Sequence, residues 1–344
     1  MLLFHFQEKR EFILNLKIML SRVANHIYWL GRYLERAENY ARFIDVNFNL
    51  MQDLPIDMKE QWKPLVAATG DLDLYNAHNH GFDSKKVLFF LTFDEKNPNS
   101  MLSAVRSARE NARIIRENLS KETWEKCNEL HYMMQEGLEK KIWKKEDPRA
   151  FYEKVKNQIL LLYGIADSSL ARTEGWYFRQ LGQFLERADK TSRILDVKYH
   201  ILLPSEEEVG TPLDFLHWMA LLKSVTAFNT YRRTYGNIAP SSVVEFLVLN
   251  KYFPRSIYYC IKEAEKCLHY ISGNLGEGYK NNAERSIGEL RSKLEFAEVG
   301  EIIKYGLHEY LDEMQFKMNA ISQQINSNFF TLRDNFSSPS MTQE

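Results

Sequence analysis

One sixteen-residue segment of this chain occurs twice. Gly31–Val46 reads GRYLERAENYARFIDV and Gly182–Val197 reads GQFLERADKTSRILDV, so that eight of the sixteen positions are identical. A second pair of segments, Val87–Ser100 and Val243–Ser256, follows in the same order and shares Val, Phe, Leu, Pro and Ser. Internal repeats constrain the architecture of a chain more than any local feature does. We therefore expect two homologous halves that fold alike.

The repeated segments have the periodicity of helices. Apolar residues recur at alternating spacings of three and four positions over Leu30–Phe48 and Leu181–Tyr199, which is typical of a helix with one face in the core. A third such stripe covers Met101–Leu119, behind Pro98, which is tolerated in the first turn of a helix. No segment has the alternation of a strand. The sequence predicts an all-α fold, an internally duplicated multi-helix bundle whose halves are related by a pseudo-twofold axis.

The repeats also suggest how the 344 residues are divided. We predict a first helical half at 19–166 and a second at 167–330, packed together as one unit. Residues 1–18 precede the repeated pattern and are interpreted as an N-terminal extension, unless the true start codon is Met19 and not Met1. Residues 331–344 lack periodicity and are expected to form a disordered tail. Further helices are predicted over residues 124–145, 149–171, 212–234, 241–250, 256–274, 279–296 and 298–328.

Composition and charge argue against several classes of function. Hydrophobic residues make up 44% of the chain and charged residues 26%, as in folded globular proteins. The net charge of -1 argues against a surface for polyanions, so we expect no nucleic-acid partner. No apolar run reaches the roughly 20 residues of a membrane span, and no membrane association is expected. The three cysteines, which form no paired CxxC pattern, indicate a reduced, cytoplasmic protein.

Each repeated helix carries a row of charged side chains beside its apolar stripe, because residues three and four positions apart share a helix face. The candidate site residues are Glu35, Arg36, Glu38, Arg42 and Asp45 in the first copy and Glu186, Arg187, Asp189, Arg193 and Asp196 in the second. A basic row on the third helix, which Arg232, Arg233 and Arg255 could extend, is a candidate anion-binding site: Arg106, Arg109, Arg113 and Arg116. Gly31 and Gly182 lower helix stability and indicate a close approach of backbone or ligand at that turn.

Two interpretations of these rows remain open. In the first, acidic and basic rows pair across the bundle as partly buried bridges that set which helices meet, since the planar guanidinium binds carboxylates through two nitrogens. In the second, the rows line a polar cleft where the arginines hold phosphate or carboxylate and the acids bind Mg²⁺ or act as acid and base. His78 and His80 are assigned to an exposed loop, so no metal site is identified. No cofactor is expected, apart from Mg²⁺ in the second interpretation.

The ordered motifs resemble those of the alpha-E domain family, an all-helical domain with a Glu-Arg motif and long of unknown function. The resemblance covers nearly the whole chain and rests on Met19–Ala24, Tyr28–Glu38, Asn97–Pro98, Ser107–Arg113, Glu174–Trp176, Tyr231–Arg233 and Phe253–Ser256. Genes of that family lie beside, or are fused to, a circularly permuted ATP-grasp protein, often with a transglutaminase-like protease. The resemblance implies these two partners and a role in amide or peptide ligation.

Three functions follow for testing. The first is a non-ATP-binding helical component of an ATP-grasp-linked peptide or amide ligation system, which binds the ligase, its peptide substrate or both. The second is an enzyme in its own right that uses the Glu/Asp/Arg rows, with Mg²⁺ as a candidate ion, on a ligation product or a phosphorylated intermediate. The third is a purely structural scaffold. An enzyme needs the rows open to solvent, whereas a scaffold seals them against each other.

Overall fold

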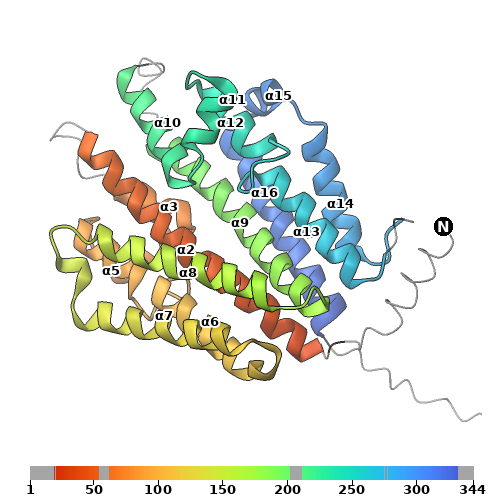
Figure 1. Ribbon diagram of the computed structural model, residues 1–344. Helices are drawn as coiled ribbons and strands as arrows, with labels where there is room; N and C mark the ends of the chain where they lie inside the picture. Colours follow the sequence, from red (N-terminus) through yellow and green to blue (C-terminus); the bar gives the residue numbers. More distant parts are fainter. Residues whose placement is uncertain are drawn as a thin grey trace, which may run out of the picture.

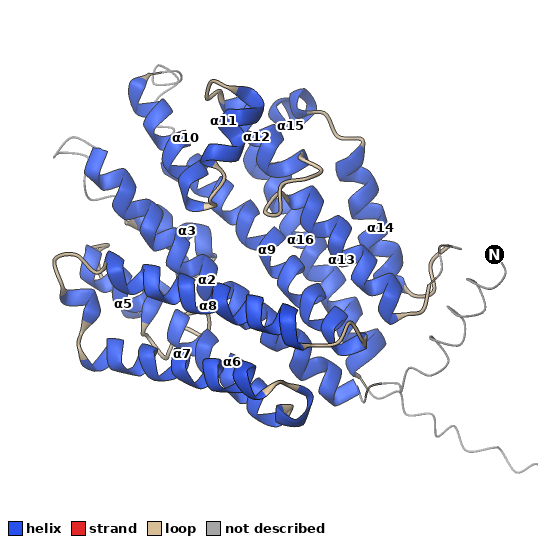
Figure 2. Cartoon of the chain, in the orientation of Figure 1, coloured by secondary structure: helices blue, strands red, loops and turns tan. Residues whose placement is uncertain are grey.

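The fold is built from helices alone in the part of the chain that the structure describes. The computed structural model describes residues 19, 21–53, 62–201, 211–274, 276 and 278–331 (Figure 1). These residues contain no strand, which confirms the all-α prediction (Figure 2). The predicted extension at 1–18 and residues 332–344 of the predicted tail lie outside the described residues.

The first half begins with a long helix, α2 (Ser21–Asp53), which contains the first copy of the repeat. The helices that follow are α3 (Lys63–Thr69), α4 (Leu72–His78), α5 (Ser84–Thr92), α6 (Met101–Ile114), α7 (Lys121–Glu139) and α8 (Arg149–Ser169). Asp83, Ser100 and Ser120 cap α5, α6 and α7, because each side chain accepts a hydrogen bond from the backbone N–H three residues on. Helices α6 and α8 both pack against α2, and α7 packs against both of them.

The second half begins with α9 (Glu174–Ile201), which contains the second copy of the repeat. It continues through α10 (Pro212–Ser224), α11 (Phe228–Tyr235), α12 (Pro240–Leu249), α13 (Ile257–Ile271), α14 (Asn282–Glu295), α15 (Val299–Tyr305) and α16 (Leu307–Ile325). A single π-helical turn, Asn326–Phe330, follows α16. Helices α13 and α16 pack against α9, and α14 packs against both of them.

The predicted helix 124–145 ends early, because α7 stops at Glu139 and a separate 3₁₀ turn, Ile142–Lys144, follows Lys141, whose φ is 52°. Two further helices predicted as continuous are interrupted. Helix 212–234 breaks into α10 and α11 at Thr226, whose φ is 56°. Arg42 stabilises the break, because its Nη1 donates to the Ser224 carbonyl at 3.0 Å and to Thr226 Oγ1 at 2.5 Å. Helix 298–328 breaks into α15 and α16 at Gly306, whose φ of 107° is accessible because glycine has no Cβ. Long-range contacts and backbone conformation therefore override the local periodicity at both points.

The predicted apolar stripes form the core. Leu34 and Ile44 of α2 and Leu185 and Leu195 of α9 are all buried. They belong to one continuous hydrophobic cluster that also contains the buried faces of α6 and α13. Removal of this apolar surface from water is the main force that holds the helices together. Within the described residues, no helix combines the length and the apolar character that crossing a membrane requires.

Helices α2 and α9 make the most extensive helix–helix contact in the described fold (Figure 1). A Cβ at Gly31 would collide with the backbone carbonyl of Arg179, and a Cβ at Gly182 would collide with the backbone carbonyl of Tyr28. A backbone carbonyl cannot move aside as a flexible side chain can. The close approach predicted at the two glycines is therefore confirmed, and its partner is the backbone of the opposite helix.

Contacts made by one half recur in the other. Helix α3, which follows α2, packs on α9, and α10, which follows α9, packs on α2. The hydroxyl of Tyr75 donates to the carbonyl of Gly81 at 2.8 Å, and that of Tyr231 donates to the carbonyl of Asn237 at 3.1 Å, six residues on in both cases. Tyr75 and Tyr231 are separated by the same 156 positions as Val87 and Val243, and they make the same local contact.

A buried glutamate–arginine network as the candidate functional site

Glu35 of α2 has no exposed surface and receives its hydrogen bonds from several elements. Arg187 of α9 donates through Nε to Oε1 and through Nη2 to Oε2, both at 2.8 Å. The hydroxyl of Tyr163 donates to Oε2 at 3.0 Å, Asn39 Nδ2 donates to Oε1 at 3.0 Å, and Arg255 Nη1 lies 3.3 Å from Oε1. Both carboxylate oxygens are therefore satisfied, as a buried charge requires.

Glu186 of α9 is the corresponding residue of the second copy and is also fully buried. Arg36 of α2 donates through Nε to Oε1 at 2.7 Å and through Nη2 to Oε2 at 3.1 Å. Arg32 Nε donates to Oε2 at 2.7 Å, and Lys190 Nζ lies 3.5 Å from Oε1. The glutamate of each copy therefore pairs with an arginine of the other copy, and in both pairs the arginine donates through two nitrogens.

The next acidic residues of the two rows bind cations one helical turn further on. Arg42 Nε donates to Glu38 Oε1 at 2.7 Å, and Arg255 Nη2 reaches both oxygens of Glu38 at 2.9 and 2.8 Å. In the other helix, Arg193 Nε donates to Asp189 Oδ2 at 3.0 Å and Lys190 Nζ donates to the same atom at 2.8 Å. The two rows thus continue as a chain of buried charge pairs.

The last acidic residues of the rows face the final long helix of each half. Lys156 of α8 donates to Asp45 Oδ2 at 2.5 Å. His308 of α16 lies with Nδ1 2.7 Å from Asp196 Oδ1. Asp45 is partly exposed, whereas Asp196 is buried. The rows therefore end in contacts that differ between the two halves in chemistry and in exposure.

The arginines keep the buried acids ionised. Burial by itself raises the pKa of Glu35, but the charge of Arg187 and the hydrogen bonds it donates lower that pKa to about 2. Burial likewise opposes ionisation of Glu186, and the charges of Arg36, Arg32 and Lys190 hold its pKa well below the ordinary value. A general acid or base works best with a pKa near the working pH. These two carboxylates are therefore poorly suited to exchange protons near pH 7.

Cations outnumber carboxylates in the network. Four acidic side chains, Glu35, Glu38, Glu186 and Asp189, contact seven basic ones: Arg32, Arg36, Arg42, Arg187, Lys190, Arg193 and Arg255. Arg193 is the most exposed of these basic side chains, at 18%. A surplus of partly desolvated guanidinium groups suits an anion such as phosphate or carboxylate. It is the feature of the network that the packing interpretation alone does not require.

The basic row of α6 does not take part in this network. Arg106 pairs with Glu95 at 2.6 Å, Arg113 with Glu110 at 2.9 Å, and Arg109 Nε donates to Asn128 at 2.7 Å. Arg116 lies 5.7 Å from the ring centre of Trp124. None of the described ion pairs joins this row to the acids of α2 or α9, because α6 turns its apolar stripe toward α2 and its arginines toward other neighbours. The expected pairing of this row with the acidic rows is wrong.

The remaining arginine candidates separate in the fold. Arg255, which we interpreted as an extension of an anion site, lies instead in the network between Glu35 and Glu38. Arg232 and Arg233 lie on the exposed face of α11, where Arg232 contacts the ring of Phe228. An anion site at Arg232 and Arg233, or at the basic row of α6, remains a prediction.

Several members of the network were missing from the candidates named from the sequence, namely Arg32, Asn39, Tyr163 and Lys190. Arg32, Asn39 and Lys190 lie inside the repeat at positions where the two copies differ. Arg32 corresponds to Gln183 of the second copy, and Asn39 corresponds to Lys190. A charge present in one copy only was therefore a usable signal. Tyr163 lies on α8, and no pattern in the sequence connects it to Glu35.

Other reactive side chains are far less accessible or lie elsewhere. Cys127, Cys260 and Cys267 are free and buried, and burial raises the pKa of each thiol to about 12. The thiolate that acts as nucleophile is therefore scarce near neutral pH. His78 is exposed but lies in the last turn of α4, not in the predicted loop, and His80 is exposed just beyond it.

The fold and the network together define a class, an all-helical protein in which two long central helices are joined by reciprocal, buried Glu–Arg pairs. Residues 19–330 match the Alpha-E family, described as a predicted alpha-helical domain with a conserved ER motif. The chain belongs to this family, as the resemblance in its motifs predicted.

Curated relatives extend the family to longer proteins. An uncharacterized protein of Mycobacterium bovis and uncharacterized proteins of two Mycobacterium tuberculosis strains are each 25% identical to this chain over 324 residues. The aligned region is 85% of this chain but 34% of each relative, so the chain spans about a third of their length. No solved structure matches the chain.

Proposed function

We propose that this protein is a non-ATP-binding helical component of an ATP-grasp-linked peptide or amide ligation system, and that it binds the ligase, its peptide substrate or both. The observation that carries the proposal is the closure of the Glu–Arg network. Glu35, Glu38 and Glu186 have no exposed surface, and each is neutralised by cations that other segments supply. Groups sealed in this way organise a fold better than they reach a substrate, which favours a binding role over catalysis by these rows.

We infer that the network joins two halves that arose by internal duplication and are related by a pseudo-twofold axis. The reciprocal pairs Glu35–Arg187 and Glu186–Arg36 support this inference, as does the meeting of Gly31 with the backbone of Arg179 and of Gly182 with that of Tyr28. Buried ion pairs need not add net stability, because desolvation offsets the Coulomb attraction, and setting helix register is a better-attested use. The network would thus align α2 with α9.

A partner has an apolar surface available on the second half. Phe296 and Tyr305 are 81% and 61% exposed, beside a pocket of about 290 Å³ between α14, α15 and α16. The charged groups Lys293, Glu301 and Glu313 surround its apolar floor. An exposed apolar patch with a polar rim is typical of a protein-binding site. We assign this patch to the ATP-grasp partner and leave the transglutaminase-like protease as a second component of the same cytoplasmic system.

The length of the relatives supports a function that needs further polypeptide. In each mycobacterial relative, the region similar to this chain accounts for 34% of the length. Other segments of those proteins accompany the helical unit in the same chain. A helical unit that works beside other domains in one protein could work beside separate proteins in another.

Affinity purification of the tagged full-length chain from its native cells, at low salt and followed by mass spectrometry, tests the proposal. We expect an ATP-grasp protein in stoichiometric amount. The double variant Phe296→Ser, Tyr305→Ser should reduce its recovery at least about tenfold, as the loss of central apolar contacts does. The matched control is Tyr132→Ser, an equally exposed tyrosine of α7 at 60%. Purification of the tagged chain without an ATP-grasp protein would contradict the proposal. So would recovery of equal amounts of the ATP-grasp protein with the unaltered chain, the double variant and the control.

The surplus of cations in the network favours a second candidate, an enzyme that acts on a phosphorylated intermediate or a ligation product, with Mg²⁺ as a possible partner of the acids. Arg193, the most exposed network cation, is the residue on which to test it. An Arg193→Gln variant that keeps its fold but loses a phosphate-dependent activity of the isolated chain would support the enzyme. A chain with neither partner nor activity would be left as a structural scaffold.

A further inference from the structure

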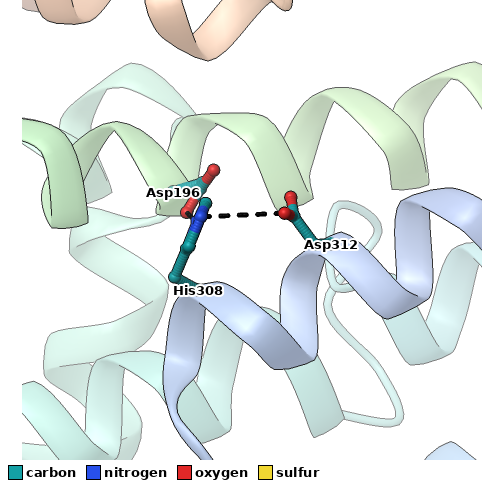
Figure 3. A group of neighbouring side chains, drawn as sticks. All are labelled: Asp196, His308 and Asp312. Atoms are coloured by element: carbon teal, nitrogen blue, oxygen red, sulfur yellow. Dashed lines mark hydrogen bonds and ion pairs between the residues drawn. The ribbon is translucent and has the colours of Figure 1, made fainter.

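Three potential metal ligands converge where α9 meets α16. Asp196 of α9, His308 and Asp312 each offer one ligand atom, and these atoms all lie within 4.8 Å of one another (Figure 3). His308 Nδ1 is 2.7 Å from Asp196 Oδ1, and its Nε2 is 3.6 Å from Asp312 Oδ2. We propose that these three side chains bind a divalent transition-metal ion, of the Zn²⁺ or Mn²⁺ class, in a site separate from the Glu–Arg pairs.

The ligand types select the class of ion. Imidazole nitrogen suits Zn²⁺ and other first-row transition metals, whereas carboxylate oxygen is also used by Mn²⁺ and Mg²⁺. One imidazole with two carboxylates therefore favours Zn²⁺ or Mn²⁺ over the all-oxygen sites of Ca²⁺ and Mg²⁺. The two negative charges would neutralise the charge of the ion, and water would complete its coordination.

The backbone holds these ligands on rigid elements. His308 and Asp312 are four residues apart in α16, so both side chains project from one face of the helix. Asp196 faces them from α9, a helix that packs along α16. Asp196 is buried with 8% of its side chain exposed, whereas Asp312 is 60% exposed. The site thus has a fixed inner ligand and an open outer side through which an ion can enter.

Within the part of the chain that the structure describes, the first half has no comparable set of metal ligands around Asp45, the residue that corresponds to Asp196. Asp45 lies 151 residues before Asp196 in the repeat, and its partner on α8 is Lys156. The residue four positions after Lys156 is Leu160, which is exposed. A lysine ammonium and a leucine cannot bind a cation. Asp45 thus faces one basic side chain, whereas Asp196 faces an imidazole and a second carboxylate.

Isothermal titration of the purified full-length chain with ZnCl₂ and with MnCl₂, after dialysis against a chelator, tests the site. We expect one saturable ion per chain. His308→Ala and Asp312→Asn should each weaken metal binding at least about tenfold. Mutating a residue that only hydrogen-bonds to a metal ligand already weakens binding by about that much, and these two residues are ligands themselves. Asp45→Asn is the matched control and should leave the affinity unchanged. Co²⁺ added in place of Zn²⁺ should give a visible absorption band that His308→Ala removes.

The outcomes separate an ion site from an ordinary His–Asp pair. Asp312 is exposed, so Asp312→Asn should keep the thermal unfolding midpoint of the ion-free protein, and loss of binding in that variant cannot be ascribed to misfolding. Absence of saturable binding to Zn²⁺ and Mn²⁺ would overturn the proposal. So would binding that both His308→Ala and Asp312→Asn leave intact. The site does not depend on the ligation role and can fail or hold independently of the partner experiment.

Discussion

Glu35 and Glu186 occupy the same position of the repeat, yet the fold supports them differently. Glu186 pairs with Arg36 and Arg32 of α2 and with Lys190 of its own helix, so its cations all lie inside the repeated segments. Glu35 pairs with Arg187 of α9 and also with Arg255, which lies just before α13. The reciprocal Glu–Arg pair is therefore common to both copies, and the residues that complete each pocket are particular to one.

The difference lies in how many elements depend on each glutamate. Arg255 contacts both Glu35 and Glu38 and thereby joins α2 to the N-terminus of α13. Its counterpart in the first half is Asn99, which accepts a hydrogen bond from Arg36 at 2.8 Å and carries no charge. The Glu35 side thus ties together more of the fold, whereas the Glu186 side concentrates more cations around a single carboxylate.

The largest effect should come from removing the charge of Glu186. Glu186→Gln leaves the buried Arg32 and the largely buried Arg36 without a carboxylate, and breaking a buried pair costs about 3–5 kcal/mol of unfolding free energy. Glu35→Gln should be less damaging, since Arg255 keeps Glu38 as a partner. Urea unfolding of both variants measures the difference. Equal losses would show that the two pockets are energetically equivalent despite their different contacts.

Acid should weaken the fold through Glu35. Its pKa is lowered from 4.5 to about 2 in the folded state, so the folded protein binds this proton less readily than the unfolded chain does. This stabilisation of about 3 kcal/mol is complete above about pH 5 and is lost as the pH falls towards 2.

Unfolding midpoints in urea between pH 7 and pH 3 measure this dependence on pH. Glu35→Gln should make it shallower. Glu95→Gln, which removes an exposed carboxylate paired with Arg106, is the matched control and should leave it nearly unchanged. A Glu35→Gln curve parallel to that of the unaltered protein would exclude Glu35 as the source.

The glycine contacts test whether the two helices approach equally closely at Gly31 and at Gly182, within one turn of the α2–α9 interface. Gly31→Ala and Gly182→Ala each place a Cβ against a backbone carbonyl, and overpacking of this kind typically costs about 1–3 kcal/mol. Gly164→Ala on α8 meets nothing within 4 Å and should instead stabilise by up to about 1 kcal/mol. Thermal unfolding compares the three. A clear inequality between the first two would show that one of the two glycine contacts is looser than the other.

The smallest effect is expected at the outer end of the first row. Asp45 is 26% and Lys156 16% exposed, so solvent screens their attraction. Asp45→Asn should therefore change the unfolding free energy by at most about 1 kcal/mol. A loss as large as that of Glu186→Gln would show that the row acts as one cooperative network and not as separate pairs.

Much of the fold could be predicted from the sequence because helix formation depends on local periodicity. The stripes over α2, α6 and α9 were recognisable, and Leu34 of α2, Val105 of α6 and Leu185 of α9 are buried as expected. The breaks at Thr226 and Gly306 were not recognisable. Arg42, which stabilises the first break, lies more than 180 residues away in the chain, and no local pattern reports such a contact.

The sequence identified four central residues of the candidate site, but it did not identify which acid pairs with which base. Glu35, Arg36, Glu186 and Arg187 were singled out by their repetition, and all four lie together at the α2–α9 interface. The basic row of α6 had an equally regular pattern and pairs elsewhere. The spacing of charged residues shows which of them share a face of one helix. Their ion-pair partners depend on which helix faces pack together in the fold.

The sequence by itself determined that this chain is helical, that it repeats, and that each copy presents a glutamate beside an arginine. These properties depend on residues close together in the chain. The tertiary structure decided that each glutamate binds the arginine of the other copy, that Arg255 completes one pocket, and that His308 and Asp312 meet Asp196. Burial and the close approach of α2 to α9 bring these groups together, and such distances arise only after the helices have packed.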